Sequence, residues 1–319
     1  MRPLLCLDCI NYNDEMTSAG LSATKYDMDW FKRRAFNSIK KIENGVWDFS
    51  DSLLLWSPTS EKVYETIQEA KSPYYSIVTE PEREFLVSIA DSIAKTLPEN
   101  FEYVDLGPGT AHKEQFLFDA LNKIGKKFTY TPVDISNHFL DIAHSYAEEQ
   151  GIPTRPFLMP FEEVSNELRS YKPIFVSLGL TYINYKPAEA LNMLKEMMGT
   201  DGIGFIDAQI RERTDIDRLV DIYKRDVYSI PEPKIILLGL NPQRDVEKYE
   251  CDDGVRGWIT LRNTNKNLQK LGVKPGDKLL TFQSLRPSLA EFEADISKIF
   301  ERYQILDNGG PFVGALLEG

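Results

Sequence analysis

The chain has 319 residues, and its 37 Lys and Arg against 49 Asp and Glu give a formal net charge of −12 at pH 7. This negative charge argues against a general role in binding nucleic acid or anionic membranes. The hydrophobic fraction of 42% is that of a globular protein, and it excludes a collagen-like or largely disordered chain.

The first 75 residues show isolated helices rather than a repeating strand–helix pattern. Apolar residues at helical spacing predict one helix over 27–42 and a second over 61–70. The apolar N-terminal stretch is interrupted at Asp8, and no part of the chain approaches the roughly 18 uncharged apolar residues of a membrane span. We therefore expect neither a signal peptide nor a membrane helix, and we place the protein in the cytoplasm.

A regular alternation of strands and helices begins near residue 80. The pattern predicts helices over 81–97, 113–124, 137–150 and 187–198, and strands over 101–106, 127–135, 154–159, 174–178 and 202–210. Strands that alternate with helices at this spacing imply a mostly parallel sheet with helices on both faces. The sequence therefore indicates an α/β protein.

The alternation breaks after residue 210 and resumes only near the C-terminus. We expect a helix over 215–228, a segment rich in Pro and Gly over 229–245, strands over 257–262 and 278–285, and a helix over 288–303. Two short apolar runs around Asn308-Gly309 predict a closing antiparallel hairpin. By analogy, this is the layout of a class I methyltransferase, a Rossmann-like fold. We expect a cofactor-binding core over 76–210 and 288–319, and a substrate-binding lobe over 1–75 and 211–287.

The most informative local motif is Gly107-Pro-Gly109, between a predicted strand and a predicted helix. Two glycines there let the backbone approach a ligand closely, and loop N–H groups can receive its polar atoms. A dinucleotide-binding loop has a third small residue at the position of His112, which would crowd a pyrophosphate. The motif therefore favours S-adenosyl-L-methionine (SAM) over NAD, and the alternative is a simple tight turn.

Two further groups of residues follow the ends of predicted strands. Asp134 lies 27 residues after Gly107 and can accept hydrogen bonds from both ribose hydroxyls, or it can instead cap the helix that follows. Asn184, in the segment Gly179-Leu-Thr181-Tyr-Ile-Asn184, offers both amide donors and an acceptor. It can hold the ammonium or carboxylate of a small substrate, or it can be a turn residue before Pro187.

The ordered motifs YYSIVTEPERE, VDLGPGTAHKEQ, TPVDIS and SLGLTYIN resemble the L-histidine Nα-methyltransferase family of ergothioneine biosynthesis. That family also includes the dimethylallyltryptophan N-methyltransferase of ergot alkaloid formation, and the resemblance spans roughly residues 70–319. It implies SAM as the cofactor. The residues implied for its binding are Gly107, Gly109, Lys113, Asp134 and, stacked on the adenine, Phe161, although Pro160 replaces the usual acidic neighbour.

The same resemblance implies a substrate site for an amine. Its residues are Tyr75, Gly179, Thr181 and Asn184, with Tyr75 and Asn184 orienting the reacting nitrogen as the catalytic pair. Where the family carries Glu and Ser that select histidine, this chain has Leu280 and Phe282. A buried pocket without hydrogen-bonding partners discriminates against an imidazole. We therefore expect a small amine or amino acid other than histidine, with Phe282 in contact with it.

These observations together predict a SAM-dependent N-methyltransferase with a small-molecule amine as its partner and no metal. The alternative is a protein of the same fold that binds SAM without turnover, as a sensor or partner subunit. Cys6 and Cys9 form a Cys-x-x-Cys without a second pair, which is a poor zinc site. Trp30, Trp47 and Trp56 are most simply core residues, and the oligomeric state is left open with a monomer favoured.

Overall fold

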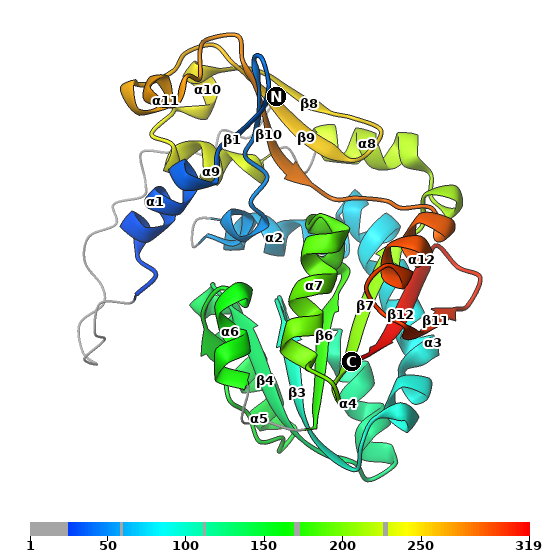
Figure 1. Ribbon diagram of the computed structural model, residues 1–319. Helices are drawn as coiled ribbons and strands as arrows, with labels where there is room; N and C mark the ends of the chain where they lie inside the picture. The colour runs from blue at the N-terminus through cyan, green and yellow to red at the C-terminus, as the bar shows by residue number, and fades with distance from the viewer. Residues whose placement is uncertain (1–24, 58–59, 111–112, 169–172, 226–228) are drawn as a thin grey trace.

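The computed structural model describes residues 25–57, 60–110, 113–168, 173–225 and 229–319, in two β-sheets surrounded by helices (Figure 1). Cys6, Cys9 and His112 lie outside these ranges, as does the end of the helix predicted over 215–228. No helix in the described part of the chain combines the length and the apolar character needed to cross a bilayer.

The larger sheet has seven strands in the order β11-β12-β7-β6-β3-β4-β5. The strands are β3 (Asn100–Leu106), β4 (Lys127–Asp134), β5 (Phe157–Leu158), β6 (Ile174–Gly179), β7 (Ile203–Gln209), β11 (Arg302–Asp307) and β12 (Phe312–Glu318). The first five are parallel, whereas β12 pairs antiparallel with β7 and with β11. This topology, with its closing hairpin, confirms the class I methyltransferase fold expected from the sequence.

Helices cover both faces of this sheet because alternate residues of each strand point to opposite sides. On β3, Tyr103 packs in one core with α3 (Glu80–Thr96), α4 (Glu114–Lys123) and α5 (Asn137–Glu149). Its neighbour Val104 packs in another core with α6 (Phe161–Leu168), α7 (Pro187–Met198) and α12 (Leu289–Ser297). The strands therefore end at a common edge, where the loops that follow them are held between two well-packed layers.

The smaller sheet has five strands in the order β1-β2-β10-β9-β8. These are β1 (Lys40–Glu43), β2 (Val46–Asp48), β8 (Val246–Cys251), β9 (Arg256–Leu261) and β10 (Lys278–Gln283). The parallel pairing of β2 with β10 joins the N-terminal segment to the segment after β7. A third core, which includes Phe31, Trp47 and Leu279, fills the space behind it.

Short helices surround the smaller sheet, which packs across the end of the larger one with α2 between them (Figure 1). They are α1 (Met28–Ser38), α2 (Glu61–Gln68), α8 (Ile216–Arg225), α9 (Pro231–Leu237), α10 (Pro242–Asp245) and α11 (Lys266–Leu271). The side chain of Lys234 on α9 is fully buried and donates to the carbonyls of Phe49, Asp51 and Thr281. Lys234 therefore ties α9 to the N-terminal segment and to β10.

Three expectations from the sequence are wrong at the level of elements. The helix predicted over 27–42 ends at Ser38, because residues 40–43 pair with β2 in a hairpin. The helix predicted over 288–303 ends at Ser297, and β11 begins at Arg302. The segment 229–245 contains α9 and α10, and the strand β8 that follows was not expected.

Candidate active site

The loop after β3 brings its backbone against side chains from three other elements. Gly107 and Gly109 have φ angles of +79° and +62°, in the region that favours glycine. A Cβ on Gly107 would lie 3.4 Å from the Phe161 ring and from Oγ1 of Thr181. A Cβ on Gly109 would lie 3.2 Å from the Tyr64 hydroxyl oxygen. Backbone geometry therefore favours glycine at both positions, and the close approach of Tyr64 adds a second reason at Gly109.

Asp134 lies at the end of β4, beside this loop, and its side chain is buried. Its Oδ1 accepts a 2.8 Å hydrogen bond from the backbone N–H of Ser136. The N-cap of α5 is Ser136, whose Oγ accepts from the backbone N–H of Phe139. The alternative in which Asp134 is the helix cap is therefore wrong. Burial raises the pKa of Asp134 to about 7, although hydrogen bonds from the backbone of Ser136 and Ile135 oppose the shift.

A small cavity lies where these elements meet. Its walls include Gly107, Gly109, Asp134 and Phe161, together with Trp56 and Tyr64 from the N-terminal segment. The structure therefore brings four of the five sequence-predicted cofactor residues into one cavity. A carboxylate, an aromatic ring and a loop with accessible backbone are groups that suit a nucleoside.

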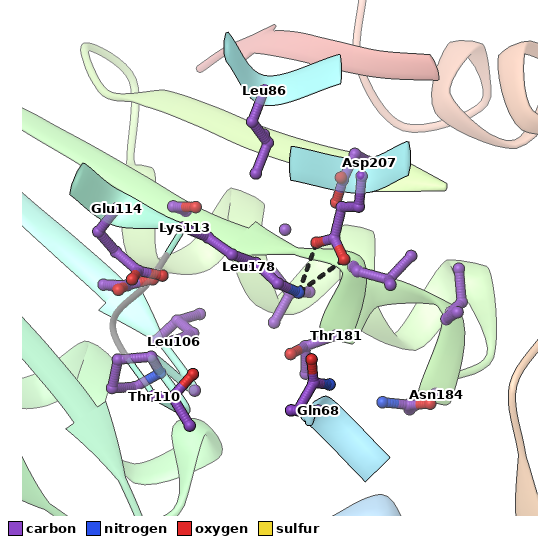
Figure 2. A pocket seen from close by; sticks show the side chains of 18 of the residues that line it. Gln68, Leu86, Leu106, Thr110, Lys113, Glu114, Leu178, Thr181, Asn184 and Asp207 are labelled. Atoms are coloured by element: carbon purple, nitrogen blue, oxygen red, sulfur yellow. Dashed lines mark hydrogen bonds and ion pairs between the residues drawn. The ribbon is translucent and has the colours of Figure 1, made fainter. Parts of the chain in front are cut away.

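The fifth residue, Lys113, extends into a larger neighbouring pocket. Its Nζ lies 2.6 Å from both carboxylate oxygens of Glu82, on α3. Burial alone would lower the pKa of Lys113, but the charge of Glu82 and its hydrogen bonds raise it above its ordinary value. In Figure 2 the dashed lines from Lys113 mark its ion pair with Glu82 and not a bond to the labelled Asp207, a buried residue of β7 whose charge also acts on Lys113.

Sequence reasoning missed both acidic residues beside Lys113. Asp207 interrupts the apolar run of β7, and a charged residue in a buried strand is a signal that could have identified it. Glu82 lies in a run of acidic residues at the start of α3, where solvated carboxylates are common, so nothing distinguished it.

The turn after β6 carries the residues predicted to hold the amine. Gly179 has a φ angle of +51° and leads into the 3-10 turn Leu180–Asn184. Gly179, Thr181 and Asn184 line the larger pocket. The backbone carbonyl of Asn184 accepts a 3.3 Å hydrogen bond from the Gln283 side chain, so the turn is fixed to the end of β10.

Tyr75 is not among the residues that line this pocket, whereas its neighbour Tyr74 is. The Tyr74 ring is buried and packs edge-on against Tyr223, with ring centroids 6.0 Å apart. Tyr75 begins a π-helical turn, Tyr75–Thr79, and its side chain is half-buried. Adjacent residues of a helix point in different directions, which is why one tyrosine faces the pocket and the other does not.

Phe282 closes the side of the pocket that belongs to the smaller sheet. Its ring stacks on that of Tyr223, at 5.8 Å between centroids and an interplanar angle of 26°. Phe282 lines the pocket, whereas Leu280 is buried but lies outside the lining. On the neighbouring strand β9, a Cβ on Gly257 would lie 1.9 Å from the Phe282 ring, so the absence of a side chain there makes room for the aromatic.

The larger pocket therefore has a polar end and an apolar arm. The polar end contains Lys113, Asn184 and Asp207, and the arm runs between α3 and α4 past Leu86 and Phe116. Within the described ranges, no three His, Cys, Asp or Glu side chains are grouped so as to hold a metal ion. The arrangement therefore places groups that suit a nucleoside around the small cavity, beside a larger and partly apolar pocket for a second molecule.

Residues 43–206 match a family described as histidine-specific, SAM-dependent methyltransferases. A curated relative, the N-methyltransferase dtpB of Aspergillus flavus, is 27% identical over 201 residues, which cover 59% of this chain and 56% of the relative. The match thus spans little more than half the length of that relative.

Solved structures with a similar fold include the PH0226 protein of Pyrococcus horikoshii OT3. It is 14% identical, with a TM-score of 0.45, over 82% of this chain and 98% of that one. Another is a SAM-dependent methyltransferase of Clostridium acetobutylicum ATCC 824, 15% identical with a TM-score of 0.43, over 82% of this chain and all of that one.

Proposed function

Because the chain belongs to the family of histidine-specific, SAM-dependent methyltransferases, we propose that it methylates the amine of a small molecule other than histidine. The reacting molecule is an amino acid or a derivative with an apolar or aromatic side chain. We further propose that segments 76–210 and 288–319 bind SAM, and that segments 1–75 and 211–287 form the substrate lobe. The sheet shared by β2 and β10 supports this division.

The small cavity has the groups that SAM requires. In this proposal, the buried carboxylate of Asp134 accepts hydrogen bonds from the ribose hydroxyls, and Phe161 stacks on the adenine. Gly107 and Gly109 let the backbone approach the nucleoside. Lys113 has three N–H donors, of which Glu82 takes two, so one is left for the methionyl carboxylate.

Bound SAM supplies an electrophilic methyl group, so the protein needs to supply only positioning and a dry site. Asn184 and Thr181 orient the amine from the turn after β6. Tyr74, which faces the pocket, takes the place that the sequence suggested for Tyr75. The apolar arm holds the remainder of the acceptor and keeps water away from the reacting nitrogen.

The observation that carries the choice of substrate is the aromatic contact between Phe282 and Tyr223 on the pocket wall. An imidazole placed against these rings would lose its hydrogen bonds with water and gain few in return. An aromatic or aliphatic side chain would instead gain contact area there. Buried polar groups without partners discriminate strongly between ligands of similar size.

The test is methyl transfer from isotopically labelled SAM to a panel of amines and amino acids. We expect aromatic or aliphatic acceptors to exceed histidine in kcat/KM by about tenfold or more, because the unpaired imidazole costs at least one hydrogen bond. Efficient methylation of histidine would contradict the interpretation of Phe282. Absence of transfer to every amine would contradict the proposed activity itself.

A further inference from the structure

The carboxylate of Asp207 lacks a partner although it is completely buried. Neither oxygen has a hydrogen-bond partner among the described residues. A buried carboxylate without donors lowers the stability of the folded state, and native proteins seldom keep one without a reason. Because the side chain also lines the larger pocket, a ligand can supply the missing donor.

The charged groups around Asp207 leave it without a cation of its own. Glu82 and Lys113 act on it directly, but they already form an ion pair with each other. The charge of Arg286 acts on Glu82, and Arg286 donates to the side chains of Gln209 and Ser284 rather than to Asp207. The phenol of Tyr64 interacts electrostatically with Lys113, and that of Tyr74 interacts with Glu82. A positively charged ligand group would therefore fit next to Asp207.

Asp207 is adjacent to the turn that we propose as the amine site. A Cβ on Gly179 would lie 3.6 Å from Oδ1 of Asp207. The carboxylate therefore lies directly against the backbone at the start of this turn. Figure 2 shows Asp207 across the pocket from Thr181 and Asn184, two polar residues of the turn that line it. A nitrogen between the turn and β7 would thus face an amide on one side and a carboxylate on the other.

We propose that Asp207 binds the ammonium group of the methyl acceptor and accepts the proton that this nitrogen must lose before methylation. This inference rests on the proposed N-methyltransferase function. In the step, an N–H bond of the ammonium breaks, its electron pair stays on nitrogen, and the proton forms an O–H bond with Asp207. The amine then carries the lone pair that methyl transfer requires, and Asp207 is neutral until it returns the proton to water.

The environment of Asp207 suits a proton acceptor. Burial and the neighbouring charge of Glu82 raise the pKa of Asp207 well above its ordinary value, although Lys113 opposes them. A higher pKa brings the acid closer to the amine whose proton it takes, which favours transfer. Asn184 and Thr181 contact the same pocket but have no group that accepts a proton at neutral pH.

A binding experiment can separate this role from cofactor binding. Wild type and Asp207→Asn, each saturated with S-adenosylhomocysteine, are titrated calorimetrically with phenethylamine and with its uncharged analogue 2-phenylethanol. We expect wild type to prefer the amine by about tenfold or more, and the variant to lose this preference while it binds the alcohol equally well. A wild type that binds neither probe, or that shows no preference, would contradict the proposal. So would a variant that loses affinity for S-adenosylhomocysteine instead, because the carboxylate would then face the cofactor.

A pH profile distinguishes proton transfer from a merely structural role. With the best amine of the acceptor panel, Asp207→Asn should lower kcat by about a hundredfold and abolish the acidic limb of the profile. Asp207→Glu should restore part of the rate. If the acidic limb of the pH profile were unchanged in Asp207→Asn, Asp207 would not be the proton acceptor. If no amine in the panel is methylated, the proposed function fails, whereas the charge preference measured by titration still reports on Asp207.

Discussion

At the scale of single residues, the proposed role of Asp134 makes cofactor binding depend on pH. Its pKa of about 7 means that the free enzyme holds much of this side chain as the neutral acid below neutrality. Only the carboxylate can accept hydrogen bonds with both oxygens. We therefore expect the affinity for S-adenosylhomocysteine to rise as the pH increases from 6 to 8.

The measurement is a calorimetric titration at pH 6, 7 and 8, with Asp134→Asn as the matched variant. The amide is similar in shape but offers only one acceptor oxygen, so affinity at pH 8 should fall by about tenfold or more. The variant should also lose the dependence on pH. An equal pH dependence in both proteins would assign the effect to another group.

The candidate site residues that the sequence predicted are those that follow strand ends. Gly107, Asp134 and Asn184 each come after an apolar run, and parallel strands bring such positions to one edge of the sheet. Asp207 and Tyr74 were not identified, because the role proposed for each depends on which way its side chain points once α3, β7 and the smaller sheet are packed together. Spacing along the chain does not contain that information.

At the scale of elements, the packing of β9 against β10 depends on Gly257, which leaves room for the ring of Phe282 on the neighbouring strand. A Cβ on Gly257 would lie 1.9 Å from Phe282, so Gly257→Ala must displace the ring from Tyr223. We expect this substitution to lower the free energy of unfolding by about 1–3 kcal/mol. Urea denaturation of the purified variant gives the value.

The double variant Gly257→Ala/Phe282→Ala provides the control for this prediction. Removal of the ring relieves the clash, so the double variant should be more stable than the sum of the two single effects predicts. Additive effects would mean that Gly257 matters for its backbone freedom rather than for the space it leaves. Both single variants should retain the affinity of wild type for S-adenosylhomocysteine, since neither residue lines the smaller cavity.

The elements that the sequence did not predict are short or lie at edges. β1 has four exposed residues and β8 is fully buried only at Val246, so neither shows the alternation of a half-buried strand. Both are edge strands whose partner lies on one side. α9 contains two prolines in its first turn, where they are tolerated, but in the sequence they indicate a loop. The parallel strands β3, β4, β6 and β7, by contrast, were predictable because they contain apolar runs and are buried over almost their whole length.

At the scale of the whole molecule, several buried carboxyl groups surround the two cavities. Burial raises the pKa of Asp105 to about 6 and that of Asp134 to about 7, and it raises those of Glu114 and Asp207 well above their ordinary values. In each case the folded protein holds the proton more tightly than the unfolded chain, whose carboxyl groups titrate near pH 4. The folded state is therefore most stable when these carboxyl groups are neutral.

This linkage predicts how stability changes with pH in the ligand-free enzyme. A carboxyl group with a raised pKa contributes stability that is present below pH 4 and is lost as the pH rises through its folded value. Between pH 5 and 7 the contribution of each such group to the free energy of unfolding falls by at most about 2–3 kcal/mol, because one pH unit corresponds to about 1.4 kcal/mol per proton. The contribution of Lys234 to stability has the opposite pH dependence, because it increases as the pH rises. Burial lowers the pKa of Lys234 to about 7, so this contribution changes only above that pH.

Thermal unfolding of the ligand-free protein at pH 5, 6 and 7 should therefore give a Tm that decreases as the pH rises. Asp134→Asn and Asp207→Asn should each flatten this decrease, because a neutral amide replaces a group that would otherwise ionise in the interior. Saturating S-adenosylhomocysteine should raise the Tm most at pH 7, where it supplies partners to the ionised form of Asp134. A Tm that rises from pH 5 to 7 in wild type would contradict this prediction, because ionisation of these carboxyl groups would then not lower the stability of the folded state.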